Sequence, residues 1–515
     1  MTWAPGRGRP VVMPEDNTPL RGRGIDARAR IAWLLRLSRL AVAPGPAGRF
    51  VEMLRAQGCM LGPSTLCRYE TGVEGVPRSI LQAYEKSLGL PAGGLLGVCL
   101  GIDRMFGPAL AGEGSQGVSR AALTDALGDW ETRVEAGSMG GTDWIQLAAA
   151  ITQPSGPVLP PSMLRSWVDK LVSETMRAVR HAYTTRTHAL ELLLTDRATG
   201  SVVLDAVARA VVRPGAQSVT NVIPVLGSST DPAVQHWLIQ HFEHSEGEQL
   251  SGAAYGLLNL ICSGRMPAGV VPQVSRAVLD AAADGPLRGE PAFLVAQRLS
   301  GALTQQVVAR LGYYPAPAAI GARVQSPTAL SNYRSAALRQ SGLDDPMLDR
   351  LLREAMSPDF VERRHHSSLL LAASPYATEL AQVAIEQVRT PVGPYAAQAA
   401  GHALSYLATP EDRDRLVELL ETVPDSRAAM LRALSYAGGV PADVDLAALA
   451  EDPALAPAVV HAAGMSNHPD LERFASNPYP GDGRLQSSAI WWQQTGSAVY
   501  DAPAPVPSEC LSLAG

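Results

Sequence analysis

Apolar residues recur at helical spacing through the first hundred residues of the chain. Each of four short segments places its apolar side chains on one face, and glycines at 58, 72 and 89 follow the last three, where helices commonly end. Pro63 and Pro77 begin two of these segments, at a position where a helix tolerates the missing N–H. The pattern predicts four helices, over Ile31–Leu40, Ala47–Gln57, Pro63–Tyr69 and Pro77–Leu88.

From about residue 118 the same period continues as one helical segment after another. Prolines and glycines interrupt it every 12 to 20 residues, and no run alternates apolar and polar residues as a half-buried strand would. Aromatic residues make up 5% of the chain and hydrophobic residues 46%, a composition that favours packed helices over a β-sandwich. We therefore predict an all-α protein.

The C-terminal third contains a repeat of 30 residues. The word Ala-Leu-Ser-Tyr at 403–406 recurs at 433–436, and the helical register of 365–376, 395–406, 425–436 and 455–466 lines up. A helix pair of this length cannot bury its apolar face alone, so neighbouring copies must stack. The pattern resembles HEAT or armadillo repeats, with a shorter period, and predicts an α-solenoid of helical hairpins. The alternative is an irregular helical bundle in which the recurrence of the four-residue sequence is coincidental.

These segments suggest five consecutive parts. We expect a flexible basic arm at 1–24, a small helical domain at 25–106, a linker at 107–117, a HEAT-like repeat domain at 118–495 and a flexible tail at 496–515.

Charge separates the N-terminal part from the rest. The net charge of the 515 residues is −6. Residues 1–110 hold 14 basic and 8 acidic residues, whereas the remainder of the chain holds 29 basic and 41 acidic residues. A basic N-terminal fifth can meet a polyanion while the acidic remainder stays away from it. A basic arm could reach a DNA groove, although a solvated tail is the simpler interpretation.

Composition also limits the setting and the chemistry. No run of about 18 uncharged apolar residues exists, and the first residues lack a secretory apolar stretch, so we expect no membrane association. Five cysteines without a CxxC pair predict neither a zinc ribbon nor disulfides, and favour a reducing, cytoplasmic setting. No phosphate loop, GxSxG or HExxH motif is present, so we expect no enzyme, no cofactor and no metal site.

The most informative motif is Gly62-Pro-Ser-Thr-Leu-Cys-Arg-Tyr-Glu-Thr-Gly72. It resembles the recognition helix of phage-repressor-like (Xre-type) helix-turn-helix transcriptional regulators of bacteria. Val76–Pro91 resembles the fourth helix of that family, and Ile31–Leu40 and Phe50–Gln57 resemble its first two helices. The resemblance covers residues 28–98 and implies a DNA-binding domain. Gly58-Cys-Met-Leu-Gly62 lengthens the usual turn, which leaves the docking angle open.

Independent physical reasoning leads to the same helix. A major groove admits one helix, whose N-terminal polar side chains meet base edges. Leu66 and Tyr69 would face the core. Ser64 could instead cap the helix, and Arg68 could instead pair with a carboxylate. The candidate DNA-binding residues are Ser64, Thr65 and Arg68 for bases, and Arg49, Arg55 and Arg78 for phosphates.

Other constellations point less clearly to function. His241 and His244 share a helix face but lack a third metal ligand, and His365-His366 resembles a solvated pair at a repeat edge. His181 and His188 share a face that could line a ligand pocket. Trp491-Trp492 would cover the last repeat or form a docking patch.

Together these patterns predict a sequence-specific DNA-binding transcriptional regulator. Its repeat domain would mediate homodimerisation or bind a protein partner or small effector, with double-stranded DNA as the main ligand. The alternative is a helical-repeat protein-interaction scaffold without DNA binding. A HEAT-like DNA-repair enzyme is less favoured, because the array is acidic and that role needs a basic concave face.

Overall fold

The computed structural model describes residues 11–20, 24–111, 120–153, 156–315, 327–357, 360–392, 395–476 and 483–501. All regular secondary structure within these ranges is helical, apart from one isolated parallel bridge between Ala178 and Val499. The all-α prediction is therefore confirmed. In the same ranges, no helix combines the length and the apolar character needed to cross a bilayer.

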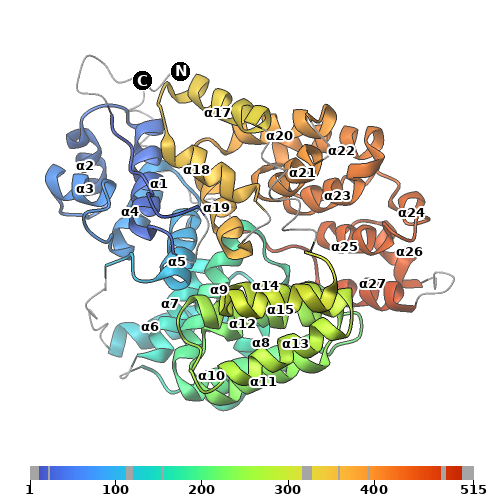
Figure 1. Cartoon of the computed structure of the whole chain (residues 1–515). Coiled ribbons are helices and arrows are strands. Elements are labelled where there is room, and N and C mark those ends of the chain that lie inside the picture. The colour runs from blue at the N-terminus through green and yellow to red at the C-terminus, as the bar shows by residue number, and fades with distance from the viewer. Residues whose placement is uncertain are drawn as a thin grey trace. The chain divides into compact units, whose positions relative to one another are not determined.

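Two compact units divide the chain, and each joins segments that are distant in sequence. Unit 1 combines Met1–Gln116 with Ile320–Gly438, and unit 2 combines Gly117–Ala319 with Gly439–Tyr500. In Figure 1, unit 1 contains the blue helices α1–α5 and the yellow and orange helices α17–α23. The consecutive domain boundaries expected from the sequence stay a prediction.

The N-terminal part of unit 1 is a group of five helices, here called the α1–α5 bundle. The Asp26 carboxylate caps the first helix by accepting a hydrogen bond from the Ala29 N–H at 2.9 Å. Gly89 ends the fourth helix in the left-handed conformation, at a φ of 66°. The helices are α1 (Ala27–Val42), α2 (Ala47–Ala56), α3 (Pro63–Glu70), α4 (Arg78–Leu88) and α5 (Gly94–Phe106).

The second part of unit 1 holds the first three copies of the 30-residue repeat, and the fourth copy, 455–466, belongs to unit 2. Each Ala-Leu-Ser-Tyr word lies near the end of a helix, at 403–406 in α21 and 433–436 in α23, and the helices between them complete hairpins. The helices are α17 (Pro327–Ser341), α18 (Pro346–Ala355), α19 (Val361–Ala373), α20 (Ala377–Arg389), α21 (Ala396–Leu407), α22 (Arg413–Thr422) and α23 (Arg427–Tyr436). A continuous solenoid over 118–495 stays a prediction.

A small residue lets two of these helices approach closely. A Cβ atom at Gly401 of α21 would lie 2.8 Å from the Cβ atom of Ala429, which is closer than real carbon contacts. Glycine is therefore required for α21 to pack against α23 at this distance. A small residue at this position of the repeat therefore allows the close packing of the two helices.

Buried ion pairs join the two parts of unit 1. Arg30 of α1 is fully buried, and its guanidinium donates to both carboxylate oxygens of Glu354 in α18, at 2.7 and 2.8 Å. Its Nε donates to Asp16 at 2.7 Å, and Arg363 of α19 also pairs with Glu354. Such a network holds its partners in one geometry, because a buried charge without its partner is costly. The α1–α5 bundle is thus anchored on α18 and α19.

The N-terminal segment is part of this anchor. Within the expected arm, residues 11–20 are described, and Met13 and Asp16 are buried. Arg350 of α18 donates to the backbone carbonyls of Asp16 and Thr18, both at 2.6 Å. Residues 1–10 and 21–23 of that arm lie outside the described residues.

Unit 2 is also built of packed helices. Trp491 and Trp492 are buried. A Cβ atom at Gly464 of α25 would overlap the Trp492 ring, so this tryptophan packs directly on α25. This position agrees with the expectation that the tryptophan pair covers the last repeat. The helices are α6 (Arg120–Ala136), α7 (Gly141–Thr152), α8 (Pro161–Arg177), α9 (Arg180–Thr195), α10 (Arg197–Val211), α11 (Pro232–His244), α12 (Gly247–Cys262), α13 (Val271–Ala283), α14 (Pro286–Leu299), α15 (Gly301–Leu311), α24 (Leu446–Leu449), α25 (Ala456–Ser466), α26 (Asp470–Ser476) and α27 (Gly483–Thr495).

Candidate nucleic-acid interface

Helix α3 presents a polar face to solvent. Ser64 and Arg68 are exposed and Thr65 is half-buried, whereas Leu66 and Glu70 are buried. Ser64 and Arg68 are four residues apart, as are Leu66 and Glu70, so each pair shares one face of the helix. The outward polar face and the inward Leu66 agree with the sequence-based expectation.

A buried carboxylate holds the inner face of α3. Arg39 of α1 donates to both oxygens of Glu70, at 2.6 and 2.8 Å, and the Tyr84 hydroxyl of α4 donates to Glu70 at 2.9 Å. Burial alone would lower the pKa of Arg39, but the Glu70 carboxylate outweighs it and raises that pKa. Phe50 of α2 packs edge-on against the Tyr84 ring, with centroids 4.8 Å apart. Three helices therefore fix the orientation of α3.

Removing the Tyr84 hydroxyl tests whether the hydrogen bonds of Arg39 and Tyr84 to Glu70, here called the Glu70 clamp, hold α3 in place. We expect Tyr84→Phe to lower the free energy of unfolding by about 1.5–3 kcal/mol, the usual contribution of a hydrogen bond to a charged group. Urea denaturation of the full chain measures it. Tyr69→Phe is the control, because Tyr69 is half-exposed and should change stability little. Equal stability of the Tyr84 variant and wild type would mean that this hydrogen bond does not hold α3.

Helix α3 begins two residues earlier than it would if Ser64 were its N-cap. Gly62 occupies the N-cap position without a side-chain hydrogen bond, and Pro63 is the first helical residue. Ser64 therefore lies inside the first turn and does not cap the helix. Its hydroxyl is exposed beside the N-terminus of α3.

Arg68 is exposed but paired. Its guanidinium forms an ion pair with Glu74, and the two side chains are 56% and 36% exposed. The loop after α3 folds back, since the Val73 N–H donates to the Arg68 carbonyl at 3.0 Å. An exposed pair of this kind contributes about 0–1 kcal/mol, so a phosphate or a guanine edge can displace Glu74 at low cost.

The three arginines expected at phosphates lie on two other helices of the bundle. Arg49 and Arg55 are exposed on α2, and Arg78 is half-buried at the start of α4. Arg49 and Arg55 are six residues apart, which places them about 120° apart around the helix. Glu52 is exposed between them and reduces the local positive charge.

The turn between α2 and α3 has a defined conformation. Gly58 has a φ of 83°, and the Cys59 N–H donates to the Leu54 carbonyl at 3.1 Å, which closes the end of α2. Residues 57–62 separate the two helices, and the Met60 side chain is 83% exposed. The extra length seen in the sequence is therefore an ordered loop beside α3.

Tyr69 and the paired histidines differ from expectation. Tyr69 is half-exposed because Glu70 occupies the core-facing position. His366 is buried and His365 is half-buried, so the prediction of a solvated pair is wrong. His366 packs edge-on against Phe106 of α5, with ring centroids 5.2 Å apart. This contact with a distant helix gives no signal in the local sequence.

The remaining histidines form no metal centre in the part of the chain that the structure describes. There, no group of three or more His, Cys, Asp or Glu side chains could hold an ion. His241 stacks on Trp237, with centroids 4.3 Å apart, and the His244 ring contacts the Gln240 carbonyl. His188 of the other pair is buried, and its Nδ1 lies 3.6 Å from Glu191.

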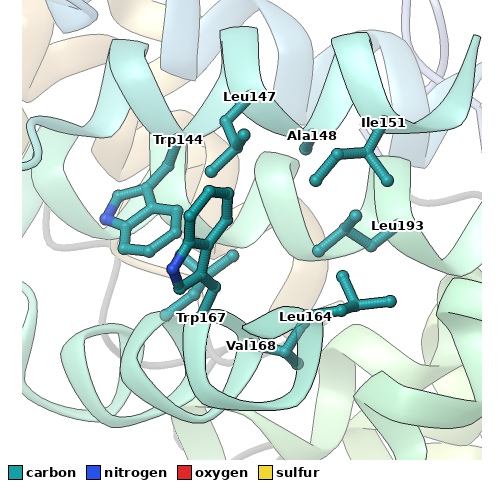
Figure 2. Close-up of a pocket in the computed structure, with 9 residues that line it drawn as sticks. Trp144, Leu147, Ala148, Ile151, Leu164, Trp167, Val168 and Leu193 are labelled. Carbon is teal, nitrogen blue, oxygen red and sulfur yellow. The ribbon is translucent and has the colours of Figure 1, made fainter. Parts of the chain in front are cut away.

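Unit 2 contains a small apolar hollow between α7, α8 and α9. Figure 2 shows Trp144 and Leu147 facing Trp167 and Val168, with Leu193 beside them. The Trp144 N–H donates to Glu174 at 2.9 Å. The hollow offers shape but no polar group to orient a ligand.

Comparison with known protein families and with curated protein sequences finds no match for this chain.

Proposed function

We propose that this chain is a sequence-specific DNA-binding transcriptional regulator that reads duplex DNA through α3. The observation that carries the proposal is the polar face of α3, with Ser64 and Arg68 exposed on a helix whose back is clamped by Arg39 and Tyr84. The resemblance of residues 62–72 to the recognition helix of phage-repressor-like regulators supports the same function.

The dimensions of α3 suit a major groove. Eight helical residues span about 12 Å, and the groove is about 12 Å wide. Ser64, Thr65 and Arg68 would meet base edges, because short hydroxyls can donate or accept hydrogen bonds there and a long guanidinium can donate them. A clamped helix also loses little conformational entropy on binding, which favours affinity.

A helix this short covers only a few base pairs. We therefore propose that two copies bind a two-fold site, as helix-turn-helix regulators do when they need a longer operator. The helical-repeat region would supply the dimer contact, or the surface for a partner or effector.

The decisive experiment titrates the full chain with genomic duplex fragments at several salt concentrations. The full chain is needed because Arg30 of α1 pairs with Glu354, which an N-terminal fragment would lack. The expected result is binding whose log affinity falls linearly with log salt concentration. Absence of binding at about 50 mM salt would contradict the proposal.

Arg55→Gln tests the phosphate contacts. Since a phosphate contact carries no sequence information, the variant should bind all duplexes more weakly and reduce the salt slope by about one. Glu52→Gln is the companion variant, because it removes the neighbouring negative charge and should strengthen binding. An unchanged slope in Arg55→Gln would remove this residue from the interface.

The second candidate function is a protein-interaction scaffold in which the N-terminal helices only cap the repeats. Two observations favour it: the α1–α5 bundle is anchored on α18 and α19 by buried ion pairs, and Arg68 is paired with Glu74. The scaffold predicts no duplex binding at any salt concentration. The titration above therefore separates the two functions.

A further inference from the structure

Helix α1 contacts the repeat on one side and α3 on the other. Arg30 donates to Glu354 of α18, whereas Arg39 donates to Glu70 of α3. The two arginines are nine residues apart, which places them about 180° apart around the helix. Helix α1 therefore joins α18 to the helix that would read DNA.

A second side chain of α1 reaches α18. Trp33 is fully buried, and its indole N–H donates to both carboxylate oxygens of Asp345, at 2.8 and 3.0 Å. Trp33 follows Arg30 by three residues, so both side chains lie on the same side of α1. The Asp345 carboxylate also caps α18 by accepting from the Leu348 N–H at 3.1 Å, and it accepts from the Tyr376 hydroxyl of α20 at 3.3 Å. Asp345 thus joins α1, α18 and α20.

Neutral groups hold the Asp345 carboxylate. Among the residues that the structure describes, no Arg, Lys or His side chain forms an ion pair with it. Burial raises the pKa of Asp345, because its hydrogen bonds compensate only in part for the loss of water. Each donor therefore matters, since a buried acceptor that loses a hydrogen bond regains no water. The indole of Trp33 supplies the shortest of the hydrogen bonds described above.

We propose that Asp345 is a positioning residue for the reading helix: it holds α1 through Trp33, and α1 holds α3 through the Glu70 clamp. The inference rests on the proposed reading of DNA by α3. Packed side chains and rigid helices transmit position between distant sites, so a carboxylate that touches no DNA would set how well α3 fits a groove. A partner or effector that shifts α18 would then change DNA affinity, which gives the repeat a regulatory role.

Trp33→Phe in the full chain tests the proposal, because it removes the indole N–H and keeps an aromatic ring. Hydrogen exchange of the Leu66–Glu70 amides should become about 10-fold faster, since losing a hydrogen bond to a charged group leaves α3 less firmly held. The amides of α22, in the same unit, should keep their wild-type rates. Duplex affinity should fall about 10-fold with an unchanged salt slope, because no phosphate contact is lost.

Tyr376→Phe is the matched control. It also removes one donor from Asp345, but that donor lies on α20 and not on α1. Exchange of α3 and duplex affinity should equal those of wild type. Urea denaturation checks that both variants are folded under the conditions of the titration. A loss of stability alone does not change the affinity of molecules that remain folded, so a fall in affinity separates positioning from a purely structural role.

Asp345→Asn is a second variant at the same contact, and it shrinks no ring. A neutral amide oxygen accepts a hydrogen bond more weakly than a carboxylate does, so α1 should be held less firmly. Exchange of α3 and duplex affinity should change in the same direction as in Trp33→Phe.

Two results on α3 would overturn the proposal. One is unchanged exchange of the Leu66–Glu70 amides in Trp33→Phe and Asp345→Asn, which would show that α1 does not transmit the contact. The other is equally fast exchange in Tyr376→Phe, which would indicate general loosening around Asp345.

The duplex titration separates this inference from the proposed function. Wild-type duplex affinity in folded Trp33→Phe, despite faster exchange of α3, would overturn the positioning role alone. Absence of duplex binding by the wild-type chain, together with faster exchange in Trp33→Phe, would overturn the proposed function and leave Asp345 a structural residue.

Discussion

Glu354→Ala is expected to lower the free energy of unfolding by about 3–5 kcal/mol, the usual cost of breaking a buried ion pair. The Glu354 carboxylate is shared by three arginines, Arg30, Arg350 and Arg363, and its side chain is 4% exposed. Removing it leaves three guanidiniums facing one another, with Asp16 as the remaining counter-charge. Urea denaturation measures the change, and hydrogen exchange of the α1 amides shows whether the anchored bundle loosens.

Asp349→Ala on the same helix is the matched control. The Asp349–Arg353 pair has similar geometry, at 2.9 Å, but its side chains are 29% and 39% exposed. Exposed pairs contribute about 0–1 kcal/mol, so this variant should remain close to wild type. Equal effects of the two substitutions would show that burial of the Glu354 network does not stabilise unit 1.

The same network should make stability depend on pH. Burial alone would raise the pKa of Glu354, but Arg30 and Arg363 outweigh it and lower that pKa below its ordinary value of 4.5. The stabilisation is therefore present above pH 4.5 and is lost as the pH falls through the folded-state pKa. Wild type should lose more stability than Glu354→Ala over this acidic range. Parallel pH profiles would contradict the role of this carboxylate.

Arg68→Ala is expected to abolish occupancy of specific genomic sites while leaving the fold intact. A guanidinium that meets a guanine edge contributes about 1–3 kcal/mol of discrimination, which corresponds to a loss of roughly 5- to 150-fold at the specific site. Its ion pair with Glu74 is exposed, so folding should not depend on it. Genome-wide mapping of the protein and duplex titration of the full chain measure the change.

Arg334→Ala is the control for this prediction. Its side chain is 56% exposed, as is that of Arg68, and each is paired with one surface carboxylate. The control should bind specific sites as wild type does. If Arg68→Ala also kept its genomic sites, α3 would not be the reading helix, even if the chain bound DNA through other residues.

The helical phase of α3 shows what could be predicted and why. Side chains four residues apart share a face, so the outward position of Ser64 and Arg68 and the inward position of Leu66 follow from local spacing. Tyr69 was expected in the core but is half-exposed. Glu70 takes that place because Arg39, 31 residues earlier, neutralises it there. A pairing across that distance is not specified by periodicity.

The histidine pair shows the same limit. Adjacent His365 and His366 point to different faces of α19, and their local sequence favours solvent. His366 is buried because Phe106 and Gly101 of α5 lie against it, more than 250 residues away in the chain.

The amino-acid order alone predicted an all-helical chain, the first four helices and the polar side of α3, because these depend on residues within one or two turns of each other. It also revealed the 30-residue repeat, because equivalent residues recur at that spacing. Tertiary structure decided which charges are buried. Arg30, Arg39 and Arg68 look alike in the chain, yet two are buried against carboxylates and the third is exposed. Burial depends on which distant helices meet, and a guanidinium enters the interior only where an opposite charge meets it.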